Sequence, residues 1–98
     1  MARRTAHEDT ETRVINDLVD FRNKRVIEIG CGNGRMTWRY ADKAKSVLGI
    51  DPGPESIAAA NAARPGELVE SVSFRVGDVT SSDFPDGSYD AAVLAWSL

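Results

Sequence analysis

The chain has 98 residues, of which 42% are hydrophobic and 28% charged, a composition typical of one small globular domain. Its net charge of −3 argues against a nucleic-acid partner that is held mainly by phosphate neutralisation. No run approaches the roughly 18 apolar residues of a membrane span, and no apolar run follows Arg3 and Arg4 as in a signal peptide. A single cysteine leaves no intrachain disulfide, so we expect a soluble protein of a reducing, cytoplasmic compartment.

The chain begins with a predicted helix over residues 7–22. Val14, Ile15, Leu18 and Val19 recur at i, i+1, i+4 and i+5, a spacing that predicts one apolar stripe facing a core. A turn at residues 22–24 then ends the helix.

Strand-like and helical patterns alternate along the rest of the chain. In order, we predict a buried strand at 25–29, a helix at 34–44, a strand at 46–50, a helix at 55–63 with Pro54 in its first turn, and strands at 72–76 and 89–96. Strands and helices that alternate at this spacing form right-handed crossovers and a parallel sheet. The last strand is apolar on both faces after Asp90, as a strand inside a parallel sheet would be, and we expect Asp90 to serve turn geometry.

A glycine run follows the first predicted strand, in the motif VIEIGCGNGR at 26–35. Gly30, Gly32 and Gly34 stand at alternate positions. A dinucleotide-binding G-x-G-x-x-G fingerprint needs a glycine at position 35, where this chain has Arg35. A glycine turn still lets the backbone approach a ligand closely, so a ligand loop that does not require a pyrophosphate is favoured over a tight turn without a ligand.

Two carboxylates follow the next two strands. Asp51 ends the second strand, where it could accept hydrogen bonds from both hydroxyls of a ribose; the alternative is an exposed turn aspartate before Pro52. Asp78 follows the third strand, where it could accept a hydrogen bond from an exocyclic amine such as that of adenine, while the backbone N–H of Val79 could serve a ring nitrogen. The alternative for Asp78 is a cap on the backbone N–H groups of a turn.

In their order and spacing, four motifs resemble those of the class I S-adenosylmethionine-dependent methyltransferases. They are VIEIGCGNGR at 26–35, GIDP at 49–52, GDV at 77–79 and YDAAVLAW at 89–96. The resemblance covers about residues 25–98 and leaves residues 1–24 as a leading helix. It implies an α/β, three-layer Rossmann-like sandwich with four parallel strands and crossover helices. It also implies that residues 25–98 are the cofactor-binding half of one truncated domain, which lacks the last three strands of the family fold.

The resemblance implies S-adenosylmethionine as cofactor and S-adenosylhomocysteine as product, and it gives each motif a role. The glycines form the loop under the methionine part, and Glu28 orients that loop and reaches the cofactor's amino group through water. Asp51 binds the ribose, Asp78 and Val79 flank the adenine, and the end of the fourth strand lies near the transferable methyl group. The implied cofactor-binding positions are Glu28, Gly30, Cys31, Gly32, Gly34, Asp51, Pro52, Asp78, Val79, Ala95 and Trp96.

Other residues near these motifs have simpler explanations. We expect Cys31 to be a passive small side chain, because no histidine lies near it in the sequence. Arg35 could meet the cofactor's carboxylate, but an exposed arginine at a helix start is at least as good an explanation. Trp38 and Tyr40 are expected to pack rather than to form an aromatic cage. No cluster has metal-ligand spacing, and the sequence identifies no catalytic residue.

Three functions remain open at this point: a methyltransferase, a non-catalytic cofactor-binding fragment that a partner chain completes, and a nicotinamide-dependent oxidoreductase. The methyl acceptor is not identified, although a small molecule is favoured. The fourth motif, LAWSL, differs from the Asn/Asp-Pro-Pro-Tyr signature of enzymes that methylate amino groups. The strand at 89–96 would be an apolar sheet edge. We therefore expect self-association or pairing with a partner strand there, or that the chain is a piece of a longer protein.

Overall fold

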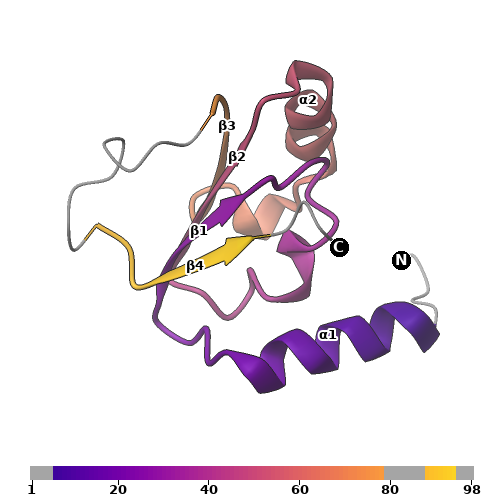
Figure 1. Ribbon diagram of the computed structural model, residues 1–98, viewed down its shortest axis with the longest axis vertical. Coiled ribbons are helices and arrows are strands. Elements are labelled where there is room, and N and C mark those ends of the chain that lie inside the picture. The colour runs from indigo at the N-terminus through magenta and orange to yellow at the C-terminus, as the bar shows by residue number, and fades with distance from the viewer. Residues whose placement is uncertain (1–5, 79–87, 95–98) are drawn as a thin grey trace.

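The computed structural model describes residues 6–78 and 88–94, with side chains from residue 12 onward (Figure 1). Its elements are α1 (Ala6–Leu18), β1 (Arg25–Ile29), a 3₁₀ turn (Thr37–Arg39), β2 (Ser46–Asp51), α2 (Pro54–Ala63), a second 3₁₀ turn (Gly66–Leu68), β3 (Val72–Val76) and β4 (Ala91–Leu94). In the described part of the chain, no helix is long and apolar enough to span a membrane.

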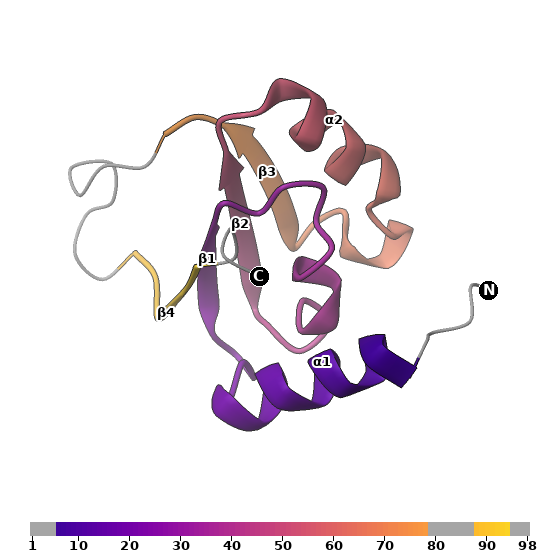
Figure 2. The ribbon, with the colours of Figure 1, turned by 45° about the vertical axis from the view of Figure 1, so that its right-hand side comes forward.

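The four strands form one parallel sheet in the order β3-β2-β1-β4 (Figure 2). The chain runs outward from β1 through β2 to β3 and then returns to the other side of β1 for β4. Glu28 in β1 therefore lies between Gly49 of β2 and Val93 of β4. This arrangement confirms the predicted α/β Rossmann-like fold with parallel strands, and it brings the carboxyl ends of β1, β2 and β3 to one edge of the sheet.

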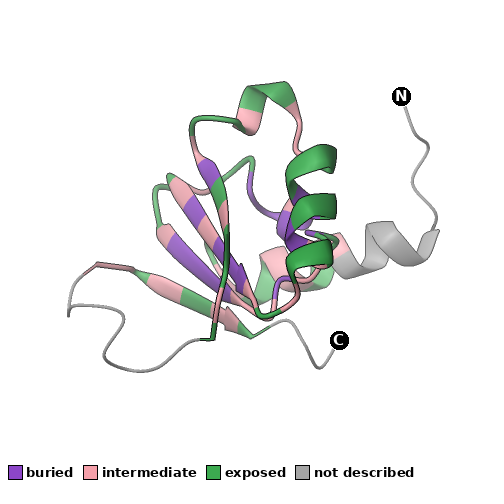
Figure 3. Ribbon diagram, turned by 90° about the horizontal axis from the view of Figure 1, so that it is seen from above, coloured by how far each residue is buried: buried purple, intermediate pink, exposed green. Residues whose placement is uncertain are grey.

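The core lies on the sheet face that carries Val26, Val47 and Val72. Around these strand residues pack Phe21, Met36, Tyr40 and Ala41, which come from the segments that flank β1. Burial is concentrated in β1 and β2, whereas β3 and β4 expose much of their length (Figure 3). The site at the carboxyl edge is thus built on the best-buried strands of the sheet.

The bounds of the strands and of α2 are close to those predicted. β1 and β3 have the predicted limits, and β2 is one residue longer because it includes Asp51. Helix α2 begins at Pro54, in the first turn, where its missing N–H leaves no hydrogen bond unmade. β4 is described from Ala91 to Leu94, and the predicted strand end at Trp96 lies outside the described residues.

Helix α1 ends four residues earlier than predicted, and the predicted apolar stripe is only half correct. Ile15 and Val19 pack against the core, but Val14 is 51% exposed and Leu18 78% exposed. After the helix the chain turns so that Phe21 is buried and stacks on Tyr40, with ring centroids 4.2 Å apart.

The predicted helix at 34–44 is wrong. The segment contains a single 3₁₀ turn at Thr37–Arg39, flanked by irregular turns. The hydroxyls of Thr37 and Tyr40 both donate to the carboxylate of Glu28. These tertiary bonds, together with the low helix propensity of threonine and aromatic residues, override the helical spacing of the apolar side chains.

The expectation that Asp90 serves turn geometry is also wrong. Its carboxylate accepts hydrogen bonds from the backbone N–H of Arg25 at 2.8 Å and from the Arg25 guanidinium at 3.2 Å. In return, the backbone N–H of Asp90 donates to the carbonyl of Arg25 at 2.7 Å. The guanidinium lowers the pKa of Asp90 to about 2. Asp90 therefore ties the start of β4 to the start of β1.

Candidate cofactor site

The glycine loop requires glycine by its backbone conformation. Gly30, Gly32 and Gly34 have φ values of 74°, 56° and 87°, all in the left-handed region that disfavours residues with a Cβ. The backbone N–H groups of Gly30 and Cys31 donate to the carbonyl of Ile50 at 2.8 and 3.2 Å. The alternate spacing of the glycines thus corresponds to a loop with a left-handed backbone conformation at every second residue. Hydrogen bonds hold this loop to the end of β2.

Two glycines, one in the loop and one in β2 beneath it, have no space for a side chain. A Cβ on Gly34 would lie 2.9 Å from the Trp38 ring. A Cβ on Gly49 would lie 2.7 Å from the Phe74 ring and 3.0 Å from Sγ of Cys31. The rings of Trp38 and Phe74 in turn meet edge to face, with centroids 5.6 Å apart. Trp38 therefore packs, as predicted, and the loop lies on a tightly packed support.

Asp51 joins the glycine loop to the end of β2. One carboxylate oxygen, Oδ2, accepts from the backbone N–H of Gly32 at 3.0 Å, and the other, Oδ1, accepts from that of Gly53 at 2.9 Å. A carboxylate has about four acceptor positions, so both oxygens keep capacity for further donors. Asp51 is half-buried and faces the cavity described next.

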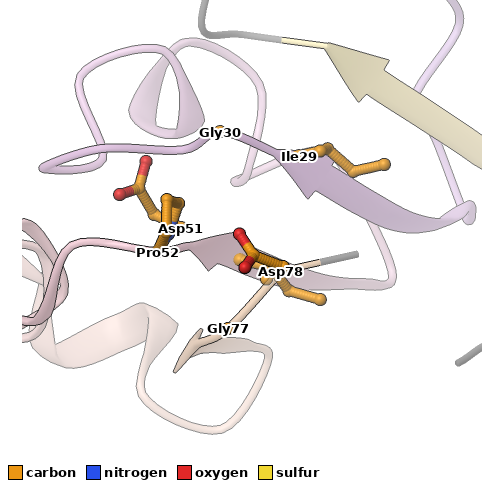
Figure 4. A pocket seen from close by; sticks show the side chains of 7 residues that line it. Ile29, Gly30, Asp51, Pro52, Gly77 and Asp78 are labelled. Carbon is orange, nitrogen blue, oxygen red and sulfur yellow. The ribbon is translucent and has the colours of Figure 1, made fainter. Parts of the chain in front are cut away.

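A cavity of about 350 Å³ opens at the carboxyl ends of the first three strands. Asp51 and Pro52 lie beside Asp78 there, with Ile29 and Gly30 across from them (Figure 4). The lining residues are Ile29, Gly30, Ile50, Asp51, Pro52, Gly77 and Asp78. The cavity thus presents two carboxylates between apolar strand ends, and none of the lining residues that the structure describes is basic.

Four of the predicted positions, Gly30, Asp51, Pro52 and Asp78, come together in this cavity. Three further residues line the cavity without having been predicted: Ile29, Ile50 and Gly77. Each directly precedes a predicted position, so the strand bounds could have indicated them. Gly32 lies beside the cavity through its bond to Asp51. The predicted positions Val79, Ala95 and Trp96 lie outside the described residues, and their roles stay predictions.

Glu28 lies under the glycine loop rather than in the cavity lining. Its carboxylate has no solvent exposure; Oε1 accepts from the Thr37 hydroxyl at 3.0 Å and from the Tyr40 hydroxyl. Burial raises the pKa of Glu28 to about 7, although the hydrogen bonds from Tyr40 and Thr37 oppose the rise. These bonds fix the segment that follows the loop, while contact with a cofactor's amino group stays a prediction.

Cys31 lies between Gly30 and Gly32, whereas Arg35 directly follows Gly34, and the two side chains differ in burial. Cys31 is buried, and burial raises the pKa of its thiol to about 12, with the charges of Glu28 and Asp51 adding to the rise. It therefore fits the predicted passive role, since the thiolate is the reactive form. The Arg35 side chain is exposed, while its backbone N–H donates to Oδ1 of Asn33 at 3.1 Å.

The groups that line the cavity indicate which kind of ligand it fits. Backbone at left-handed glycines allows close approach, the carboxylates of Asp51 and Asp78 accept hydrogen bonds and attract positive charge, and the strand ends offer apolar contact. A phosphate would instead call for basic side chains or a cradle of free N–H groups. Within the described residues, no group of three or more His, Cys, Asp or Glu side chains could hold a metal ion.

Sequence comparisons place the chain among methyltransferases. Residues 26–98 match the family described as methyltransferase domain. A probable chloroplastic tocopherol O-methyltransferase of Oryza sativa subsp. japonica is 33% identical over 97 residues, which are 97% of this chain and 26% of the rice protein. A tRNA U34 carboxymethyltransferase of Saccharophagus degradans is 39% identical over 46 residues, which are 46% of this chain and 14% of that protein.

Solved structures share the fold. The YcgJ protein of Bacillus subtilis superposes with a TM-score of 0.75 at 25% identity, covering 88% of this chain and 37% of that one. An S-adenosylmethionine-dependent methyltransferase from Mesorhizobium loti gives 0.68 at 28% identity, covering 91% and 39%. The [4+2]-cyclase SpnF gives 0.71 at 32% identity, covering 86% and 32%. Given the family match over residues 26–98 and this shared fold, the chain belongs to the class I S-adenosylmethionine-dependent methyltransferase domain family and spans part of the family fold.

Proposed function

We propose that this chain supplies the S-adenosylmethionine site of a methyltransferase, with a small molecule favoured as the methyl acceptor. The observation that carries the proposal is the cavity between the left-handed glycine loop and the carboxylates of Asp51 and Asp78. S-adenosylmethionine carries a sulfonium, an ammonium and one carboxylate group but no phosphate, so positive charge predominates. A cavity whose described lining holds two carboxylates and no basic residue fits that charge distribution.

The residues divide the cofactor among them. Asp51 accepts hydrogen bonds from the ribose hydroxyls with the acceptor positions that Gly32 and Gly53 leave open. Asp78 accepts from the adenine amine, and Ile29 and Ile50 give the apolar walls against the base. The carboxylate of Asp51 thereby connects the ribose to the glycine loop, so that ligand binding and loop position are coupled.

The bound cofactor supplies an activated methyl group with a good leaving group. The protein's part is then to hold donor and acceptor in line, an effect worth up to about 7–11 kcal/mol in well-arranged cases. The loop and Asp51 fix the donor side of that geometry in the described residues. A reducing, cytoplasmic location also belongs to the proposal, since the one cysteine is buried as a free thiol.

Two other functions are alternatives to this proposal. A carboxylate at the position of Asp51 would also suit the ribose of a nicotinamide dinucleotide, but Arg35 stands where the G-x-G-x-x-G fingerprint needs its last glycine. Cofactor binding without methyl transfer, with the site completed by a partner chain, is the second alternative. The similarity to a protein described as a [4+2]-cyclase supports this second alternative, because the fold alone does not determine the reaction.

The test is a calorimetric titration of the chain with S-adenosylmethionine and, separately, with NADH. We expect the sulfonium cofactor to bind and NADH not to bind. Asp51→Ala should weaken cofactor binding by about 1–3 kcal/mol, because it leaves the ribose hydroxyls and the Gly32 N–H without their acceptor. The matched control is Asp42→Ala, which removes an exposed carboxylate elsewhere. NADH binding without cofactor binding would refute the proposal, and an unchanged affinity of Asp51→Ala would remove Asp51 from the site.

A further inference from the structure

The two carboxylate oxygens of Glu28 differ in their hydrogen bonding. Its Oε1 accepts two hydrogen bonds, from Thr37 and Tyr40, whereas Oε2 is buried and lacks a hydrogen-bond partner among the described residues. A buried carboxylate oxygen without a donor carries a full desolvation penalty unless a proton or a cation neutralises it. The pattern therefore calls for a neutralising group at Oε2.

Among the described residues, the groups that face Glu28 provide no positive charge. From the 3₁₀ segment come the Thr37 hydroxyl and the phenol of Tyr40, and from the glycine loop comes the thiol of Cys31. Burial raises the pKa values of both Tyr40 and Cys31, so both are neutral at pH 7. The cross-strand neighbours, Gly49 and Val93, have no titratable side chain.

We propose that Tyr40 is a positioning residue for the cofactor. With Thr37 it occupies Oε1 of Glu28, so that Oε2 holds a proton in the cofactor-free domain. Glu28 releases this proton when the cofactor's ammonium group binds. The proton passes to solvent, and the charged carboxylate then faces the ammonium group, directly or through one water. The inference rests on the proposed function, because it needs S-adenosylmethionine at the glycine loop. It adds that binding is linked to proton release.

Tyr40 is suited to set this exchange. It has no solvent exposure, and its ring is held by the stack on Phe21, so the hydroxyl has a fixed place against Oε1. Its hydrogen bond favours the charged form of Glu28 and opposes the effect of burial. Tyr40→Phe keeps the ring stack and removes only that donor, so Glu28 should then hold its proton to a higher pH.

The experiment is isothermal titration calorimetry of the chain with S-adenosylmethionine, in pairs of buffers that differ in ionisation enthalpy. The slope of heat against that enthalpy counts the protons released. At pH 6, where an α-amino group is almost fully protonated, we expect wild type to release close to ~1 proton per cofactor and Glu28→Gln to release close to none. At pH 7.5, with Glu28→Gln as baseline, Tyr40→Phe should release roughly two- to threefold more than wild type. Asp42→Asn, the matched control, should follow wild type.

Each outcome decides between the claims. Absence of cofactor binding to the folded wild-type chain would refute the proposed function, and the inference with it. Binding with the same proton count in wild type and Glu28→Gln would overturn the inference and leave the proposed function standing. A folded Tyr40→Phe variant with the wild-type pH profile would remove Tyr40 from the exchange, because a purely structural role does not move that profile.

Discussion

Replacing Glu28 by glutamine should change how the stability of the chain depends on pH. The amide oxygen of glutamine still accepts from Thr37 and Tyr40, and the side chain has nearly the same shape. What disappears is the titration of a fully buried carboxyl group. The perturbation thus isolates one charge in a packed site.

The magnitude follows from the pKa of Glu28, which burial raises from 4.5 to about 7. Below pH 4.5 the carboxyl is protonated in both the folded and the unfolded chain, and its contribution to stability is fully present. Between pH 4.5 and 7 the unfolded chain releases the proton while the folded chain keeps it, so the free energy of unfolding falls as the pH rises. Above pH 7 the loss is complete, at roughly 3 kcal/mol.

The assay is urea unfolding, followed by circular dichroism, of wild type and Glu28→Gln between pH 4.5 and 8.5. The difference in unfolding free energy between them should shift by roughly 3 kcal/mol across this range, in favour of the variant at high pH. Asp20 and Asp90, whose pKa values their arginine partners lower to about 2, add stability that is lost only as the pH falls below 3.8. A difference that stays constant from pH 4.5 to 8.5 would refute the burial argument.

Three further predictions concern the loop and the sheet edge. Gly32→Ala should lower the free energy of unfolding by about 1–2 kcal/mol, the cost of a left-handed alanine. Gly34→Ala should lower it by more, because its Cβ also meets the Trp38 ring. Equal losses in urea unfolding would contradict the steric argument. Cys31 should resist iodoacetamide at pH 8 in the folded chain and react after unfolding in urea, whereas fast labelling of the folded chain would contradict its burial and its pKa of about 12. The apolar β4 edge at 91–94 should cause self-association, and a monomer at high concentration in size-exclusion chromatography would argue against this.

The parts of the fold that the sequence predicted well are those that local chemistry determines. The apolar run before Gly30 predicted β1, Pro54 marked the start of α2, and the three alternate glycines predicted a loop, in which each of these glycines has a positive φ. Asp51 and Asp78 reach one cavity because parallel strands bring their carboxyl ends to one edge. In these places the residue type and its position suffice.

The errors arose where contacts distant in the sequence decide. The spacing in residues 34–44 is helical, but Tyr40 is held by Phe21 and Glu28, and that arrangement replaces a helix by turns. Likewise, no local pattern shows that Asp90 pairs with Arg25 across the sheet, at a separation of 65 residues. The predicted buried strand at 25–29 already implied that Glu28 is buried. Its partners could not be foreseen, because Thr37 and Tyr40 lie in the segment that was predicted as a helix.

We expect the cavity at the carboxyl ends of β1, β2 and β3 to bind S-adenosylmethionine. The most direct measurement is a titration of the ¹⁵N-labelled chain, followed through the backbone amide signals in NMR spectra. We expect the cofactor to shift the signals of Gly30, Gly32, Asp51 and Asp78 and NADH to leave them in place. Shifts with NADH alone, or cofactor shifts confined to residues outside this cavity and its glycine loop, would contradict this expectation.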